Sequence, residues 1–275
     1  MTIIENKTFD EERALYASDG IKAVSCRFDG PADGESAFKE SRNVITEKCF
    51  FNLRYPFWHT KILEISDCEM TALCRAALWY SSDIRISDSR LHGIKALREC
   101  KDIEMENTDI ISPEFGWFSE NIKMTRCTAE GEYFMLRAKN LNFDGVSLTG
   151  KYSFQYIENC TFENCTFNTK DAFWHAKNVT VKNSEINGEY LAWYSENITF
   201  ENCRISGTQP LCYCKGLRLI NCTMDNADLA FEKSEVEARL SAPVISIKNP
   251  KSGYIKVPAY DELILTETSD CVISD

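Results

Sequence analysis

Three features are missing from this 275-residue sequence. It has no excess of basic residues, because 31 Lys and Arg stand against 42 Asp and Glu and leave a net charge of −11. Nucleic acids and anionic membranes bind basic surfaces, so the composition argues against both as partners. No apolar run is long enough to span a bilayer, and the first residues show no charged region followed by an apolar segment. We therefore expect a cytoplasmic protein.

The sequence also lacks a C-x-x-C pair, although it contains 13 cysteines. Cys212 and Cys214 form a C-x-C motif that has no second pair to complete a metal site, so we predict no bound metal. The odd total and the expected reducing compartment argue against a disulfide framework. We predict that the cysteines are free and fill the core as small apolar side chains.

What the sequence does contain is a 19-residue repeat, which two series of apolar residues mark. The first series consists of Ile86, Met105, Met124, Phe143, Phe162, Val181, Phe200 and Leu219. The second lies two residues earlier, at Ile84, Ile103, Ile122, Leu141, Cys160, Val179, Ile198 and Leu217. A period this short and regular predicts a solenoid, in which each repeat buries its apolar face against its neighbours.

Within one repeat, Val179 and Val181 alternate with polar residues, which indicates a short strand with one buried face. Asn recurs at two positions that read as corners, because Asn tolerates left-handed backbone geometry. No segment shows a sustained helical period. The sequence therefore predicts an all-β fold, a single-stranded parallel β-helix with three short strands in each 19-residue coil.

We predict one domain over residues 1–275, with about twelve coils between residues 14 and 239. Residues 1–13 are expected to form an N-terminal cap. Residues 240–275, where the period fails, are expected to form a C-terminal β cap. Within it, residues 244–247 and 254–257 resemble the two strands of a β-hairpin around Asn249 and Gly253.

All five tryptophans occupy one position of the repeat, in its first strand. The following position holds His59, Tyr80, Glu99, Phe118, Arg137, Tyr156, His175, Tyr194, Tyr213 and Glu232. Because side chains alternate along a strand, one set must face solvent. We favour a buried Trp174 with Phe173 and His175 exposed, because Ala176 copies the buried position before an Asn corner.

An exposed aromatic strip on a protein surface usually marks a contact site. We predict an extended carbohydrate-like ligand, bound along the strip by Tyr80, Phe118, Tyr156, His175, Tyr194 and Tyr213. The same strip would suit a homo-oligomer or another protein interface, and the terminal segments could simply cover it. No cofactor is predicted.

A third hypothesis is a saccharide lyase or hydrolase. Its catalytic candidates are Glu99, Arg137, His175 and Glu232. A general acid or base needs a partner within hydrogen-bond reach. These residues lie too far apart along the predicted coils, so the repeat shows no compact catalytic constellation.

Five stretches carry a family resemblance. They are residues 96–100, 152–156, 171–175, 208–214 and 229–232. They resemble an uncharacterised bacterial domain-of-unknown-function family of single-stranded right-handed β-helix proteins. The resemblance covers nearly the whole chain and implies a right-handed, pectin-lyase-like fold without an established activity. Pectate lyases and polygalacturonases share that fold, but this chain lacks their clustered Asp and neighbouring basic residues, so no catalytic residue is transferred.

Overall fold

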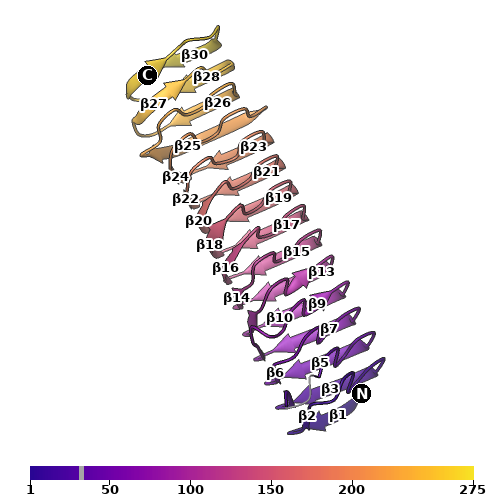
Figure 1. Ribbon diagram of the computed structural model, residues 1–275. Coiled ribbons are helices and arrows are strands. Elements are labelled where there is room, and N and C mark those ends of the chain that lie inside the picture. Colours follow the sequence, from indigo (N-terminus) through magenta and orange to yellow (C-terminus); the bar gives the residue numbers. More distant parts are fainter. Residues whose placement is uncertain (31–33) are drawn as a thin grey trace. The chain divides into compact units, whose positions relative to one another are not determined.

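The computed structural model describes residues 1–30 and 34–275, so residues 31–33 of the predicted coil region lie outside the described residues. The regular secondary structure of the described residues consists only of β-strands. The chain divides into two compact units, Met1–Lys139 (unit 1) and Asn140–Asp275 (unit 2). In each unit, successive coils place one strand in a long sheet, sheet A, and most place a shorter strand in a second sheet, sheet B (Figure 1).

In unit 1 the strands pair in parallel with those one coil away. Sheet A contains β1 (Thr2–Glu5), β3 (Asp19–Val24), β5 (Arg42–Glu47), β7 (Lys61–Ser66), β10 (Ser82–Ser87), β13 (Lys101–Glu106) and β15 (Glu120–Thr125). Sheet B contains β2 (Thr8–Phe9), β4 (Arg27–Phe28), β6 (Phe50–Phe51), β8 (Glu69–Met70), β11 (Arg90–His92), β14 (Asp109–Ile111) and β16 (Thr128–Glu132). A third side carries β9 (Leu78–Trp79) and β12 (Leu97–Arg98).

Unit 2 repeats this plan. Its sheet A contains β17 (Lys139–Asp144), β19 (Glu158–Glu163), β21 (Lys177–Lys182), β23 (Glu196–Glu201), β25 (Leu217–Asp225), β26 (Glu235–Leu240), β28 (Ser252–Lys256) and β30 (Asp270–Ser274). Its sheet B contains β18 (Ser147–Lys151), β20 (Thr166–Lys170), β22 (Glu185–Asn187) and β24 (Arg204–Ser206). β25 also pairs with β24, while β27 (Val244–Lys248) pairs with β29 (Tyr260–Ile264).

The 19-residue register holds in both units and stacks like side chains in the core. Ile84 pairs with Ile103 in unit 1, and Phe162 pairs with Val181 in unit 2. Phe143 and Phe162 are fully buried, and their ring centroids lie 5.3 Å apart. The predicted all-β parallel solenoid is therefore confirmed.

Coiling extends further than the sequence predicts, to about fourteen turns. Residues 1–13 and 240–275, expected as caps, contain strands that pair in parallel with the adjoining coils. The predicted β-hairpin is wrong, because β27 pairs with β29 and β28 pairs with β26 and β30, all in parallel. Alternating apolar residues on two strands are produced equally by successive sides of a coil, so the pattern did not distinguish the two arrangements.

The third side of most coils is a turn rather than the predicted third strand, and we call it the turn face. In unit 2, its residues at alternate positions are left-handed, with φ of 54° at Asp171, 60° at Phe173 and 55° at His175. The amide of Phe173 donates to Ser153 O of the preceding coil, whereas that of His175 donates to Trp193 O of the following coil. These bonds between coils offset a conformation that costs about 1–2 kcal/mol per residue.

This geometry overturns the predicted burial of Trp174. Phe173 points into the core and has no exposed surface, while Trp174 and His175 are half-buried at the surface. The prediction assumed strand alternation, which a chain alternating between left- and right-handed residues does not follow. Both the tryptophan position and the position after it therefore reach the outer surface.

Two predicted ladders are present at the corners and in the core. In unit 2, the side-chain amide of Asn197 donates to Asn178 Oδ1 at 3.2 Å, and that of Asn178 donates to Asn159 Oδ1 at 3.1 Å. Twelve of the 13 cysteines are buried free thiols, as predicted. Burial raises the pKa of the Cys100 thiol to about 12, so this side chain behaves as an inert apolar group.

Candidate functional site

Four aromatic side chains stack in successive coils of unit 2. This set, which we call the ring row, consists of Tyr156, His175, Tyr194 and Tyr213. Neighbouring ring centroids lie 4.8, 5.2 and 4.8 Å apart, with interplanar angles of 10°, 11° and 13°. Each interior ring has both faces covered by its neighbours, so the row presents ring edges, hydroxyls and an imidazole to solvent. Tyr156 and Tyr194 remain 42% and 44% exposed.

Two tryptophans lie beside the ring row, at the preceding position of the turn face. The indoles of Trp174 and Trp193 stack at 5.4 Å with an interplanar angle of 4°. Their Nε1 atoms donate to Tyr190 O and Gln209 O, both at 2.7 Å. Because each indole is tied to the next coil, this pair forms a rigid apolar border for the ring row.

A column of alternating charges borders the other side of the ring row. It consists of Glu158, Lys177, Glu196 and Lys215, each two residues after a member of the row. Lys177 Nζ lies 3.2 Å from Glu196 Oε2, and Glu196 pairs with Lys215 in a parallel bridge. Opposite charges one coil apart cancel, so this border has little net charge.

Asp171 is a turn-face residue that sequence reasoning set aside. It is only 8% exposed, and burial raises the pKa of its carboxyl group; Lys170 opposes this shift and Glu189 adds to it. Within the described residues, its carboxylate has no hydrogen bond or ion pair. The sequence signal was its position in the stack, since Tyr152 and Tyr190 stand one coil before and after it.

The corresponding surface of unit 1 has a different composition. His59 and Tyr80 stack at 4.9 Å, but the next residue at this position is Glu99, followed by the exposed Phe118. At the preceding position, the Arg98 guanidinium lies 5.1 Å from the Trp79 ring centroid and 5.1 Å from that of Trp117. A charge thus takes the place that a ring occupies in unit 2.

The predicted catalytic candidates have different surroundings within their own units. In unit 1, Glu99 Oε1 accepts hydrogen bonds from Trp79 Nε1 and Arg98 Nε, both at 3.3 Å, and Arg137 is exposed. In unit 2, His175 lies between two tyrosine rings. Glu232 binds Lys248 at 3.1 Å instead.

Glu232 also lies outside the ring-row position to which the sequence assigned it. The left-handed residue at the ring-row position of this coil is Lys233, with φ of 54°, because 20 residues rather than 19 separate it from Tyr213. A strict 19-residue count therefore placed Glu232 one position too far along the turn.

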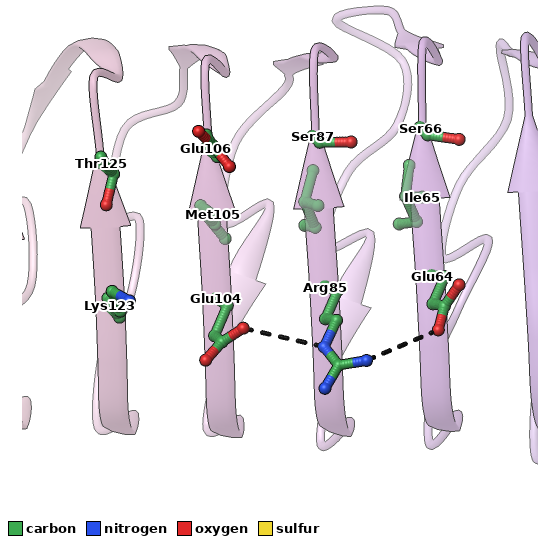
Figure 2. Close-up of a pocket in the computed structure, with 11 residues that line it drawn as sticks. Glu64, Ile65, Ser66, Arg85, Ser87, Glu104, Met105, Glu106, Lys123 and Thr125 are labelled. Atoms are coloured by element: carbon green, nitrogen blue, oxygen red, sulfur yellow. Dashed lines mark ion pairs between the residues drawn. The ribbon is translucent and has the colours of Figure 1, made fainter.

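Sheet A of unit 1 carries a shallow depression of about 330 Å³ over β7, β10, β13 and β15. Figure 2 shows the Arg85 guanidinium between the carboxylates of Glu64 and Glu104, and both ion-pair distances are 3.7 Å. A second row of Ser66, Ser87, Glu106 and Thr125 lies beside it. These ion pairs are highly exposed, so the depression offers a solvated, charge-balanced surface rather than an enclosed reaction site.

Comparisons with known proteins identify the family but no activity. The surface adhesin PfbA of Streptococcus pneumoniae is 10% identical, with 95% of this chain and 85% of that chain covered and a TM-score of 0.40. The A-module of the Azotobacter vinelandii mannuronan C-5 epimerase AlgE4 is also 10% identical, with coverage of 98% and 84% and a TM-score of 0.35. No curated protein matches the chain.

In the described part of the chain, no helix is long and apolar enough to cross a membrane. Residues 2–273 match a family described as a protein of unknown function, DUF3737, which confirms the resemblance drawn from the five sequence stretches. The chain belongs to this DUF3737 family.

Proposed function

We propose that the turn face of unit 2 binds an extended carbohydrate along the ring row. The observation that carries this proposal is the stack of Tyr156, His175, Tyr194 and Tyr213, in which one polar ring edge repeats per coil. A tyrosine hydroxyl both donates and accepts hydrogen bonds, as a sugar hydroxyl does. A row of such groups suits a polymer that presents hydroxyls at a regular spacing along the stack.

The stacking determines how the ligand makes contact. Sugars often lie flat against an aromatic face, but each interior face of the ring row is covered by a neighbouring ring at about 5 Å. We expect hydrogen bonds to the ring edges, with apolar contact from Trp174 and Trp193. The balanced charges of Glu158, Lys177, Glu196 and Lys215 impose no strong overall sign on the ligand.

A binding role fits this surface better than hydrolysis. Glycosidases use two carboxyl groups placed on opposite sides of the scissile bond, about 5–10 Å apart. On the turn face of unit 2, Glu232 is held by Lys248, and His175 has aromatic neighbours on both sides. Neither residue has a partner suited to proton transfer, so the proposal assigns no reaction to this surface.

The test is binding of neutral and charged oligosaccharides, measured by isothermal titration calorimetry. We compare wild type with a Tyr156→Ala, Tyr194→Ala double variant. The matched control is Tyr80→Ala, Phe118→Ala, which removes two similarly exposed rings from unit 1. We expect at least a tenfold loss of affinity in the first variant and little change in the control. An equal affinity for all three proteins would reject the ring row as the binding surface.

Sedimentation of the same proteins separates carbohydrate binding from self-association. If wild type is oligomeric and the Tyr156→Ala, Tyr194→Ala variant is monomeric while both bind saccharide equally, the ring row is an interface between copies of the chain. If all three proteins sediment identically and only the ring-row variant loses affinity, the carbohydrate proposal stands.

A further inference from the structure

Asp171 is a largely buried residue whose carboxylate has no hydrogen bond or ion pair among the described residues. The residue is only 8% exposed, but its carboxylate oxygens keep contact with solvent, and the nearby Lys170 partly offsets the effect of burial on its pKa. Asp144 contacts Asn164, and Glu232 contacts Lys248. Among the acidic residues described in unit 2, Asp171 is the only one that is buried.

The residues that stand one coil before and one coil after Asp171 are both tyrosines. By coil register it lies between Tyr152 and Tyr190, since the amide of Tyr152 donates to Lys170 O and that of Asp171 donates to Glu189 O. From the same turn, the Trp174 indole reaches over to Tyr190 O in the next coil. Asp171 thus places a carboxylate in a column with two tyrosines, four residues before the ring-row residue of its coil.

A carboxylate in this setting favours one class of binding partner. Burying an unpaired charge is costly, and the cost falls when an opposite charge or a hydrogen-bond donor arrives. Aromatic rings attract cations through their faces, most strongly when water is excluded. A ligand that carries an ammonium group would satisfy both the carboxylate and the rings, whereas a neutral hydroxyl satisfies only the carboxylate.

We propose that Asp171 binds a protonated amino group of the ligand, so that the unit 2 surface recognises a polymer of amino sugars with free amines. This inference rests on the proposed carbohydrate function and assigns its ligand class. The ring row contacts the sugar hydroxyls, and Asp171 distinguishes a free amine from an acetylated one. Acetylation removes the charge and adds bulk at the same nitrogen.

The experiment compares three soluble probes of equal length by calorimetry: a glucosamine oligomer, its N-acetylated form and a lysine-rich peptide. The proteins are wild type, Asp171→Asn and the control Asp228→Asn, which removes one charge from a half-buried acid elsewhere in unit 2. Asparagine preserves the shape of Asp171, and circular dichroism confirms folding. We expect wild type and the control to bind the glucosamine oligomer at least tenfold more tightly than the N-acetylated form. Asp171→Asn should bind both alike.

The outcomes separate this inference from the proposed function. If Asp171→Asn keeps the wild-type preference while Tyr156→Ala, Tyr194→Ala weakens all saccharide binding, the amine assignment is wrong and the ring row stands. If Asp171→Asn alone loses the glucosamine oligomer and the double tyrosine variant does not, the amine site stands and the ring row is wrong. Binding of the peptide alone would overturn the saccharide assignment, and binding of no probe would overturn both proposals.

Discussion

The turn faces of the two units share a backbone geometry but differ in what they present to solvent. In unit 2, the ring row and the stacked Trp174 and Trp193 form aromatic columns. In unit 1, Arg98 lies between Trp79 and Trp117, and its guanidinium also reaches Glu99 and Glu114 at 3.3 and 3.8 Å. On the turn face of unit 1, the charged side chain of Arg98 thus makes its contacts with other residues of the same unit.

This difference indicates which surface is available to a ligand. The polar atoms of Arg98 and Glu99 already have partners within unit 1, so a ligand would have to replace those contacts. The ring edges of Tyr156 and Tyr194 point to solvent, and Asp171 lacks a partner among the described residues. The same solenoid plan therefore yields a surface with internal charge contacts in unit 1 and a surface with solvent-facing ring edges in unit 2.

The variant with the largest expected effect tests whether Phe173 of unit 2 points into the core while Phe118 of unit 1 points to solvent. Phe173→Ala should lower the free energy of unfolding by about 3–5 kcal/mol, because it leaves a cavity beside Phe154, whose ring lies 5.0 Å away. Phe118→Ala in unit 1 should change it by less than about 0.5 kcal/mol, because Phe118 is 44% exposed. Urea unfolding followed by circular dichroism measures both, and equal losses would contradict the assigned orientations.

Arg98→Met tests the charge contacts that distinguish unit 1. We expect a loss of about 2 kcal/mol in unfolding free energy, since the variant removes two cation–π contacts and leaves Glu99 with one fewer donor. Arg85→Met is the control, because Arg85 is 72% exposed and its ion pairs should contribute under about 1 kcal/mol. A loss for Arg98→Met no larger than that of the control would show that the guanidinium does not stabilise this face.

Asp171→Asn should slightly stabilise the protein at neutral pH, because it removes a partly desolvated charge that has no hydrogen bond or ion pair among the described residues of unit 2. The raised pKa of Asp171 means that the folded state holds its proton to a higher pH than the unfolded state does. The corresponding stability is present below the unfolded pKa of about 3.9 and is lost as the pH rises through the folded pKa. Thermal unfolding of Asp171→Asn and wild type is compared at about pH 3 and about pH 7, on either side of this titration. The variant should be more stable than wild type only at the higher pH.

Asp109 in unit 1 should give the smallest effect, with the opposite sign. Burial favours a higher pKa for Asp109, but hydrogen bonds with His92 at 2.9 Å and Thr128 at 2.7 Å outweigh it and lower the pKa. Its stabilising contribution is present above the unfolded pKa and is lost as the pH falls through the folded pKa. Asp109→Asn should therefore reduce stability slightly at neutral pH and not in acid. A larger loss in acid would contradict the assigned contacts.

The sequence predicted the architecture because the core repeats without interruption. Phe143 and Phe162 lie over one another, as the 19-residue spacing requires. The prediction failed where turn geometry replaces strand geometry. Nothing in the side chains of Phe173 or Tyr156 signals a left-handed backbone, and residues of these types rarely adopt it alone. The orientation of Trp174 depended on that geometry, whereas the shift at Glu232 came from one additional residue in its coil.

The candidate site was predictable in part for the same reason. The column of Tyr156, His175, Tyr194 and Tyr213 follows from the repeat, so the sequence named its members correctly as neighbours in a stack. The surroundings of Asp171 did not follow, because the partners of a carboxylate depend on distances between coils rather than on spacing along the chain.

The sequence by itself determined that equal apolar windings stack into a parallel solenoid with Asn corners, since each repeat can bury its apolar series only against an identical neighbour. Only the tertiary structure decided which residues of the turn face enter the core and which ring faces stay accessible. Those choices depend on backbone handedness and on contacts between coils, and many side-chain types can occupy either position.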